Sequence, residues 1–122
     1  MDAIKLGLVE ARFADIIWDS APLLTTELVN ICAEELEWKR TTTYTVLKKL
    51  CDRGIFHTQN SIVTVLISRE EFHAIQGEQF LEESYKGSLP AFIAAFTKRK
   101  PLSEEEAEEI HSLIDAYRRR KQ

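Results

Sequence analysis

The sequence predicts a mostly α-helical protein with one β-hairpin, in the order three helices, the hairpin and three further helices. Apolar residues recur at helical spacing along most of the 122 residues. Only seven residues are glycine or proline, too few for an all-β fold with many turns. β-Branched residues concentrate in a single stretch, residues 55–67, where the period changes from helical to alternating.

The first two helices are predicted from apolar stripes and from the residues that interrupt them. Phe13, Ile16 and Ile17 mark an amphipathic helix over residues 8–19, which Ser20-Ala21-Pro22 ends. Thr25 is expected to cap the second helix with its hydroxyl. That helix carries the apolar residues Leu28, Val29, Ile31, Cys32 and Leu36.

A third helix is expected over residues 41–53, with Gly54 as its C-terminal cap. At 3.6 residues per turn, its inward face comprises Thr43, Val46, Leu47 and Leu50. The hairpin follows, with strands at residues 55–58 and 61–67 and a polar Gln59-Asn60 turn.

Two capping boxes organise the second half of the chain. Ser68 with Glu71 opens a helix over residues 69–85, and Ser103 with Glu106 opens the last helix. A short apolar helix over residues 88–98 lies between them, and Pro101 ends it.

Three helices followed by a hairpin form the winged helix-turn-helix order, in which one helix enters the DNA major groove. We therefore expect a winged-helix DNA-binding domain over residues 1–68 and a helical dimerisation region over residues 69–122. The exposed side of residues 41–49 is rich in threonine, whose hydroxyl and methyl groups suit close contact with base edges. Threonine is a mediocre helix former, which makes an ordinary solvated surface helix the weaker interpretation.

Charge is distributed in agreement with a DNA partner, although the net charge is −4. The window from Lys39 to Arg53 carries five basic residues and one acidic residue. Residues 70–122 are net acidic. A basic patch can bind phosphates on an acidic body because contacts act within about one Debye length, ~8 Å at physiological salt.

Other functional classes find little support in the sequence. His57, His73 and His111 have no spacing typical of a catalytic triad or metal site, so we expect no enzymatic activity, no cofactor and no metal. Cys32 and Cys51 match no zinc motif. The apolar uncharged stretch from Gly87 to Thr97 is too short for a membrane span, and the N-terminus does not resemble a secretory signal. We expect a cytoplasmic protein that does not bind membranes directly.

From Leu6 to Tyr117 the sequence resembles the BlaI/MecI-type penicillinase and methicillinase repressors of Gram-positive bacteria. The residues that carry the resemblance in the first half are Glu10, Ile16-Ile17-Trp18, Pro22-Leu23, Glu27-Leu28, Trp38, Thr42-x-x-Thr45-x-Leu47-x-Lys49-Leu50 and Arg53-Gly54. In the second half they are Leu66-Ile67-Ser68-x-Glu70-Glu71, Phe80-Leu81, Tyr85-Lys86-Gly87-Ser88, Phe96 and Leu102-Ser103-x-Glu105-Glu106.

The resemblance implies a repressor that binds a palindromic operator in double-stranded DNA through helix 41–53. The implied DNA-binding residues are Lys39, Arg40, Thr41, Thr42, Tyr44, Thr45, Lys48 and Lys49. Lys39, Thr41 and Tyr44 depart from the family pattern, which places Ser-Pro at 39–40 and Lys or Arg near 41 and 44. The hairpin is about four residues shorter than in relatives and its tip carries no basic residue, so we expect weak or absent wing contacts to phosphate.

The resemblance also implies a homodimer joined by the C-terminal helices. About fifty residues of short amphipathic helices are too few for an independent core, whereas a second copy would cover their apolar stripes. The expected interface residues are Phe72, Phe80, Leu81, Leu89, Phe92, Ile93, Phe96, Ile110, Leu113, Ile114 and Tyr117. The alternative is that these helices fold back on the winged helix in a monomer.

In relatives, a membrane-bound sensor with a zinc protease domain senses β-lactam, and cleavage of the repressor relieves repression. The family's Asn-Phe cleavage point maps onto Ala95-Phe96, where this sequence keeps the phenylalanine but not the asparagine. Proteolysis at this bond is therefore a hypothesis. Two alternatives stay open: a winged-helix regulator released by a small-molecule ligand, and a helical interaction module with no DNA role.

Overall fold

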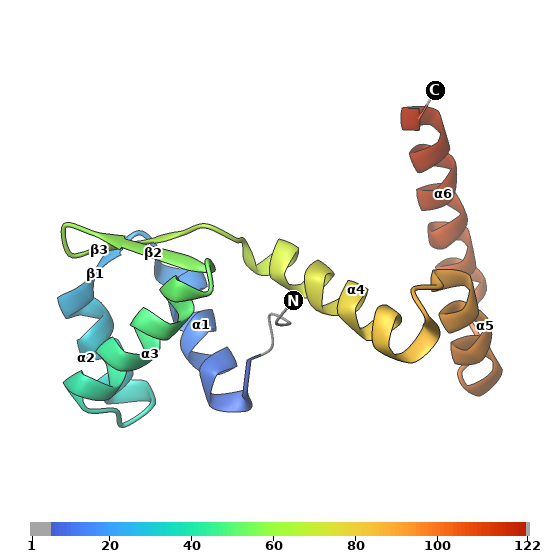
Figure 1. Cartoon of the computed structure of the whole chain (residues 1–122). Coiled ribbons are helices and arrows are strands. Elements are labelled where there is room, and N and C mark those ends of the chain that lie inside the picture. The colour runs from blue at the N-terminus through green and yellow to red at the C-terminus, as the bar shows by residue number, and fades with distance from the viewer. Residues whose placement is uncertain (1–5, 122) are drawn as a thin grey trace. The chain divides into compact units, whose positions relative to one another are not determined.

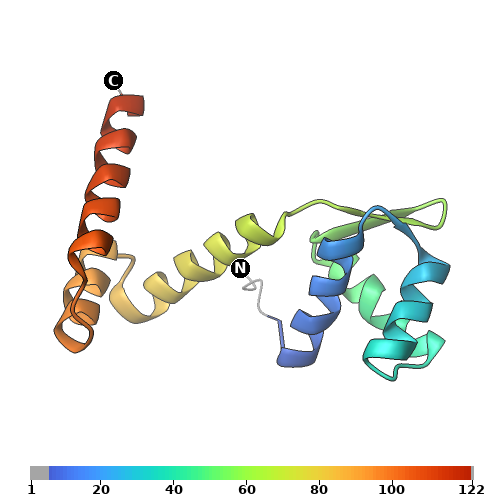
Figure 2. The same cartoon turned by 180° about the vertical axis from the view of Figure 1, so that it is seen from behind.

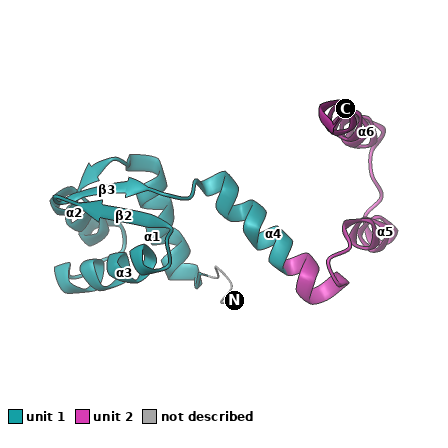
Figure 3. Cartoon of the chain, turned by 45° about the horizontal axis from the view of Figure 1, so that its top comes forward, with its two compact units in different colours: residues 1–79 teal, residues 80–122 magenta. Residues whose placement is uncertain are grey.

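The computed structural model describes residues 6–121 and separates into two compact units, residues 1–79 and 80–122 (Figure 3). We call them the first unit and the second unit. The division falls within a helix, α4, that spans Arg69–Tyr85. The boundary expected after residue 68 therefore differs from the division in the structure. The first turn of α4 packs against other residues of the first unit, Trp18 among them.

The first unit contains α1 (Leu8–Ser20), α2 (Thr25–Glu35) and α3 (Arg40–Asp52), together with a small sheet (Figures 1 and 2). The sheet consists of β1 (Leu23–Leu24), β2 (Phe56–Gln59) and β3 (Ile62–Val65). This arrangement confirms the predicted winged helix-turn-helix. Its core includes Phe13 and Ile17 from α1, Leu28 from α2 and Phe56 from β2, all fully buried.

The strand β1 was not expected from the sequence. It pairs antiparallel with β3, with Leu23 opposite Val63, so the sheet order is β1-β3-β2. Two residues are too few to show a period, and only the partner strand identifies them as a strand.

The pairing of β1 also overturns the expected role of Thr25. Leu24, in extended conformation, is the N-cap of α2, and Thr25 is the first helical residue, with its side chain buried. The Thr25 backbone N–H donates to the Ser61 carbonyl at 2.9 Å, and the Glu27 carboxylate accepts the Leu24 N–H. The threonine is thus a packing residue and not a cap.

The hairpin turn lies one residue further along the chain than expected. Gln59 pairs with Ile62, which leaves Asn60 and Ser61 as the turn residues. Both have positive φ, 52° and 63°, the combination of a type I′ turn. Gly54, with φ of 81°, follows α3 as predicted.

The start of α4 packs against α1 within the first unit. The Ser68 hydroxyl accepts from the Glu71 N–H at 3.0 Å, and the Phe72 ring is only 2% exposed. Phe72 contacts Trp18 of α1, with ring centroids 5.3 Å apart. The expectation that Phe72 belongs to a dimer interface is therefore wrong, because this side chain is part of the chain's own core.

The second unit comprises the end of α4, α5 (Leu89–Arg99) and α6 (Glu104–Lys121). The chain reverses at Lys86 and Gly87, both with positive φ, and the Ser88 hydroxyl caps α5 by accepting the Ala91 N–H. The predicted box at Ser103 is confirmed, since Ser103 and Glu106 exchange hydrogen bonds of 3.3 and 3.0 Å. Among the described residues of this unit none is buried.

Candidate nucleic-acid interface

One face of α3 holds the helix in the core of the first unit. Thr43, Leu47 and Leu50 are buried and Val46 is half-buried, as predicted. The Thr43 hydroxyl donates to the Lys39 carbonyl at 3.4 Å, and burial raises the pKa of the Cys32 thiol of α2. The buried face of α3 therefore holds the helix in place.

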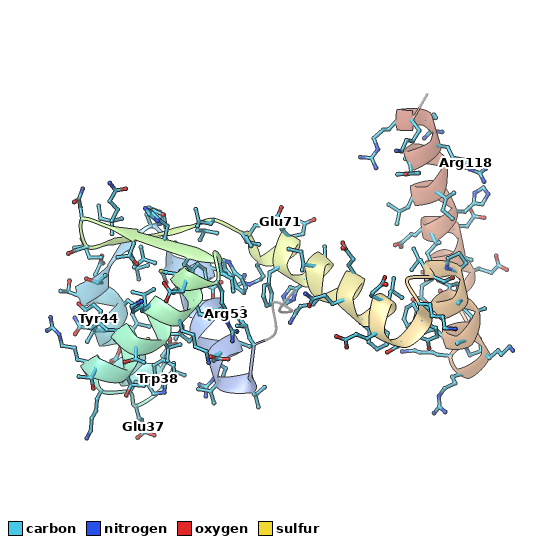
Figure 4. The ribbon with its side chains drawn as sticks, viewed as in Figure 1. Glu37, Trp38, Tyr44, Arg53, Glu71 and Arg118 are labelled. Carbon is cyan, nitrogen blue, oxygen red and sulfur yellow. The ribbon has the colours of Figure 1, made fainter. Side chains whose placement is uncertain are left out.

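Trp38 fixes the start of α3. Its indole stacks on Phe13 of α1, with ring centroids 5.3 Å apart and planes inclined by 27°. Its backbone N–H donates to the Cys32 carbonyl at 3.2 Å, directly after Glu37, which has a positive φ of 56°. These contacts define the tight connection between α2 and α3, where Figure 4 labels Glu37 and Trp38.

The opposite face of α3 is exposed and polar. Thr41, Thr45 and Lys48 are all exposed and succeed one another at helical spacing. The Thr45 hydroxyl donates to the Thr41 carbonyl at 2.9 Å, which leaves its oxygen lone pairs and its methyl group for an outside partner. Such a surface suits contact with base edges in a major groove.

Tyr44 borders this face on the side of the wing. It is half-buried, and the Arg40 guanidinium lies 5.5 Å from its ring centroid. Figure 4 shows Tyr44 and Arg53 toward opposite ends of α3. A groove of about 310 Å³ separates α3 from β2, and its lining comprises Tyr44, Leu47, Lys48, Cys51, Phe56, His57, Thr58 and Leu66. The Cys51 thiol and the Thr58 hydroxyl lie 3.4 Å apart, joining helix and strand.

The two lysines of α3 have different surroundings. Lys48 pairs with Asp52 on the same helix at 3.0 Å, at the centre of the exposed face. Lys49 pairs with Glu10 of α1 at 2.7 Å. That contact and the Gly7 N–H lower the pKa of the Glu10 carboxyl. Thr42 precedes Lys49 by two helical turns and lies on the same edge of α3.

The structure therefore brings most of the predicted DNA-binding residues onto one side of α3. Lys39 and Arg40 are exposed at its N-terminus, next to Thr41, while Lys49 is drawn toward α1. Sequence reasoning missed Glu10 as the partner of Lys49. Their separation of 39 residues carries no pattern that would have revealed it.

The wing presents few charges to a nucleic acid. Its tip is Gln59, Asn60 and Ser61, all exposed and none basic. The prediction of weak phosphate contact at the wing stays a prediction.

The residues expected to form a dimer interface, apart from Phe72, lie on helices with half-buried or exposed apolar side chains. Phe80, Leu89, Ile93, Phe96, Leu113, Ile114 and Tyr117 are exposed. Leu81, Phe92 and Ile110 are half-buried. Phe92 contacts the rings of Phe80, Tyr85 and Phe96 at centroid distances of 5.5 to 5.8 Å. The second unit thus offers apolar side chains on all three of its helices.

The expected cleavage point lies inside a regular helix. Ala95 and Phe96 belong to α5, which ends three residues after Phe96. Both residues border a groove of about 520 Å³ together with Tyr85 and Phe92.

Within residues 6–121 no three His, Cys, Asp or Glu side chains are grouped as a metal site would require. None of the helices there combines the length and apolar character of a membrane span.

The sequence is similar to two known repressors along almost its whole length. The Bacillus licheniformis "Penicillinase repressor" is 22% identical over 121 residues, 96% of this chain and 94% of that protein. The Staphylococcus aureus "Methicillin resistance regulatory protein MecI" is 20% identical over 115 residues, 91% of this chain and 94% of that protein. The family model described as "Penicillinase repressor" matches residues 6–116, which confirms the resemblance seen in the sequence. The chain belongs to the penicillinase repressor family.

Proposed function

We propose that the protein is a homodimeric DNA-binding repressor of a β-lactam-resistance operon, which acts in the cytoplasm and binds a palindromic operator with α3 in the major groove. The observation that carries the proposal is the exposed side of α3, where Thr41, Thr45 and Lys48 stand on a helix held from behind by buried residues. Family membership and the names of both relatives support the repressor role.

The first experiment asks whether α3 contacts the operator. A footprint on the DNA upstream of the gene defines the site, and titration measures its affinity. Thr45→Val keeps the shape of the side chain and removes the hydroxyl, so we expect at least about tenfold weaker binding. The matched control is Thr97→Val in α5, whose hydroxyl donates to the Ile93 carbonyl just as Thr45 does to Thr41. Equal binding by both variants would favour an interaction module with no DNA role.

The dimer part of the proposal rests on the apolar side chains of the second unit and on the charges of α6. That helix begins with Glu104, Glu105 and Glu106 and ends with Arg118, Arg119, Arg120 and Lys121. Two copies of α6 in antiparallel orientation would place acidic turns against basic turns over the stripe that contains Leu113 and Ile114. A two-fold protein then matches a two-fold operator.

Sedimentation tests the dimer. Leu113, 69% exposed, is replaced in Leu113→Glu, which we expect to yield single chains that keep their helical content. The control Leu8→Glu changes the even more exposed Leu8 of α1 and is expected to sediment as the unmodified protein does. Single chains for the unmodified protein at working concentration would instead indicate a monomer.

We propose further that cleavage at Ala95-Phe96 by a membrane-bound sensor metalloprotease relieves repression. The bond lies in α5, which has no residue buried within the single chain, so packing inside one chain adds little to the cost of unfolding this helix locally. Cleavage would separate α6 from the rest of the chain and remove the gain in effective concentration that joins two half-sites. Incubation with the cognate sensor should release a fragment ending near residue 95, and its absence would eliminate this route.

Release by a small molecule is the second candidate, because a groove of about 550 Å³ lies between α1 and α2. Its lining includes Asp15, Asp19, Glu34 and Glu35 against a single basic residue, Arg12. This charge favours a cationic ligand, whereas a β-lactam with its carboxylate would be repelled. We therefore expect no thermal shift with a β-lactam in the absence of protease, and a shift would favour the ligand mechanism.

A further inference from the structure

The beginning of α4 is attached to α1 by one arginine. Arg69 donates through Nε to Asp15 Oδ1 at 3.1 Å and through Nη2 to Asp19 Oδ1 at 2.7 Å. The same Nη2 lies 3.2 Å from the Asp15 carbonyl oxygen, so the guanidinium spans one turn of α1. All of these residues belong to the first unit.

Trp18 of α1 completes the attachment from the other side. Its indole Nε1 donates to the Ile67 carbonyl at 3.0 Å, and Arg69 lies over its ring at 5.6 Å. The ring also contacts the buried Phe72. We call Asp15, Trp18, Asp19, Ile67, Arg69 and Phe72 the α4 clamp.

The parts of the α4 clamp contribute differently. Trp18 and Phe72 supply the apolar burial that holds α4 against α1, but an apolar contact has little directional preference. The Arg69 side chain is 40% exposed, and ion pairs of this kind add little to stability. A planar guanidinium that reaches two carboxylates is directional, however, and it restricts rotation of the first turn of α4 about Phe72.

We propose that Arg69 is a positioning residue, which fixes the direction in which α4 leaves the winged helix and so limits the half-site spacing that the repressor accepts. This inference rests on the proposed function, since it needs a dimer on a palindrome. One added base pair moves a half-site by about 3.4 Å along the DNA and turns it by roughly 35° about its axis. Two winged-helix domains cannot follow that change if each is held in a fixed direction relative to its α4. Domains that are free to turn about the start of α4 can follow it.

Binding to operators of altered spacing tests the role of Arg69. Three forms are compared on the footprinted operator and on versions with one central base pair added or removed: the unmodified protein, Arg69→Gln and the control Arg99→Gln. The control removes the same charge from an exposed residue at the end of α5. We expect the unmodified protein and the control to lose at least about tenfold in affinity on the altered spacings, and Arg69→Gln to lose less than about threefold.

A single half-site provides the readout that separates positioning from a general loss of structure. All three forms should bind one half-site equally, because α3 and its core are unchanged. Asp15→Asn combined with Asp19→Asn should reproduce the spacing tolerance of Arg69→Gln. Retention of the unmodified spacing preference by Arg69→Gln would overturn the proposal.

Hydrogen exchange tests the α4 clamp without DNA. The Glu71 and Phe72 amides bond to Ser68 in the first turn of α4, and in Arg69→Gln we expect them to exchange several-fold faster while amides of α3 are unchanged. Unchanged exchange at both amides would show that Arg69 does not hold this turn. If the unmodified protein binds no palindrome, the proposed function and the spacing role fail together, while exchange still decides whether the clamp exists.

Discussion

The Lys49 ammonium of α3 lies 2.7 Å from the Glu10 carboxylate of α1. The pair joins the helix proposed to enter the groove to α1, and it engages a lysine that the family resemblance implies for DNA binding. Glu10 also accepts the Gly7 N–H at 3.0 Å, so one carboxylate caps α1 and orients Lys49.

The Glu10–Lys49 pair should make stability depend on pH. The pKa of Glu10 is lowered in the folded protein from its ordinary value of 4.5, chiefly by Lys49 and then by the Gly7 N–H. A lowered pKa stabilises the folded state above the unfolded value, and this contribution is lost as pH falls below 4.5 through the folded value. The Lys49 side chain is about half exposed, so the pair should contribute about 0.2 to 1 kcal/mol at pH 7.

A double-mutant cycle with Glu10→Gln and Lys49→Gln, measured by urea unfolding, isolates this contribution. The coupling should decrease in high salt and disappear in acid. Zero coupling at pH 7 and low salt would show that the pair contributes nothing to stability.

Glu10→Gln should also strengthen DNA binding. Without its carboxylate partner, Lys49 can approach a phosphate, and each added phosphate contact steepens the dependence of log K on log salt by about 0.9. Titrations at several salt concentrations measure the slope. The double variant Glu10→Gln/Lys49→Gln should show no such increase, and a decrease in affinity for Glu10→Gln alone would contradict the prediction.

Phe72 and Phe80 lie on the same helix, but their truncation to alanine should affect different properties. We expect the first to lower stability and the second to weaken self-association. Phe72→Ala empties a buried site and should cost about 3 to 5 kcal/mol of unfolding free energy in the first unit. Phe80 is exposed, so Phe80→Ala should cost much less in that unit and should weaken self-association instead. Urea unfolding and sedimentation equilibrium distinguish the two effects, and equal unfolding curves would refute the assignment of Phe72 to the core.

The two cysteines should react with iodoacetamide at different rates. Burial raises the pKa of the Cys32 thiol, which lowers the fraction of reactive thiolate, and the side chain is inaccessible. Cys51 is half-buried and borders the groove between α3 and β2. Mass spectrometry should find Cys51 modified first and Cys32 modified only on unfolding, and the reverse order would contradict this placement.

Glycine in place of Ser61 in the hairpin turn should stabilise the first unit. Ser61 adopts φ of 63°, a conformation that glycine reaches without the penalty of a Cβ. Ser61→Gly should therefore stabilise the first unit by up to about 1 kcal/mol in thermal unfolding. Ser112→Gly, in the exposed middle of α6, is the control and should destabilise, because glycine weakens a regular helix.

Local patterns in the sequence predicted most of the elements that the structure contains. The stripe of α1, the inward face of α3 and the serine-based helix starts at residues 68 and 103 depend on neighbours three or four residues away. Thr25 was predicted incorrectly because its surroundings are decided by β3, more than thirty residues further along the chain.

The sequence by itself determined the order of helices and hairpin, the threonine-rich outer face of α3 and the family, because each is encoded in short periods or in matched positions along the chain. The tertiary structure alone decided that Lys49 is paired with Glu10, that Phe72 is core and that Arg69 holds α4 to α1. Each of these contacts joins residues 39 to 54 positions apart, and only the packing of α1 against α3 and α4 brings them into contact.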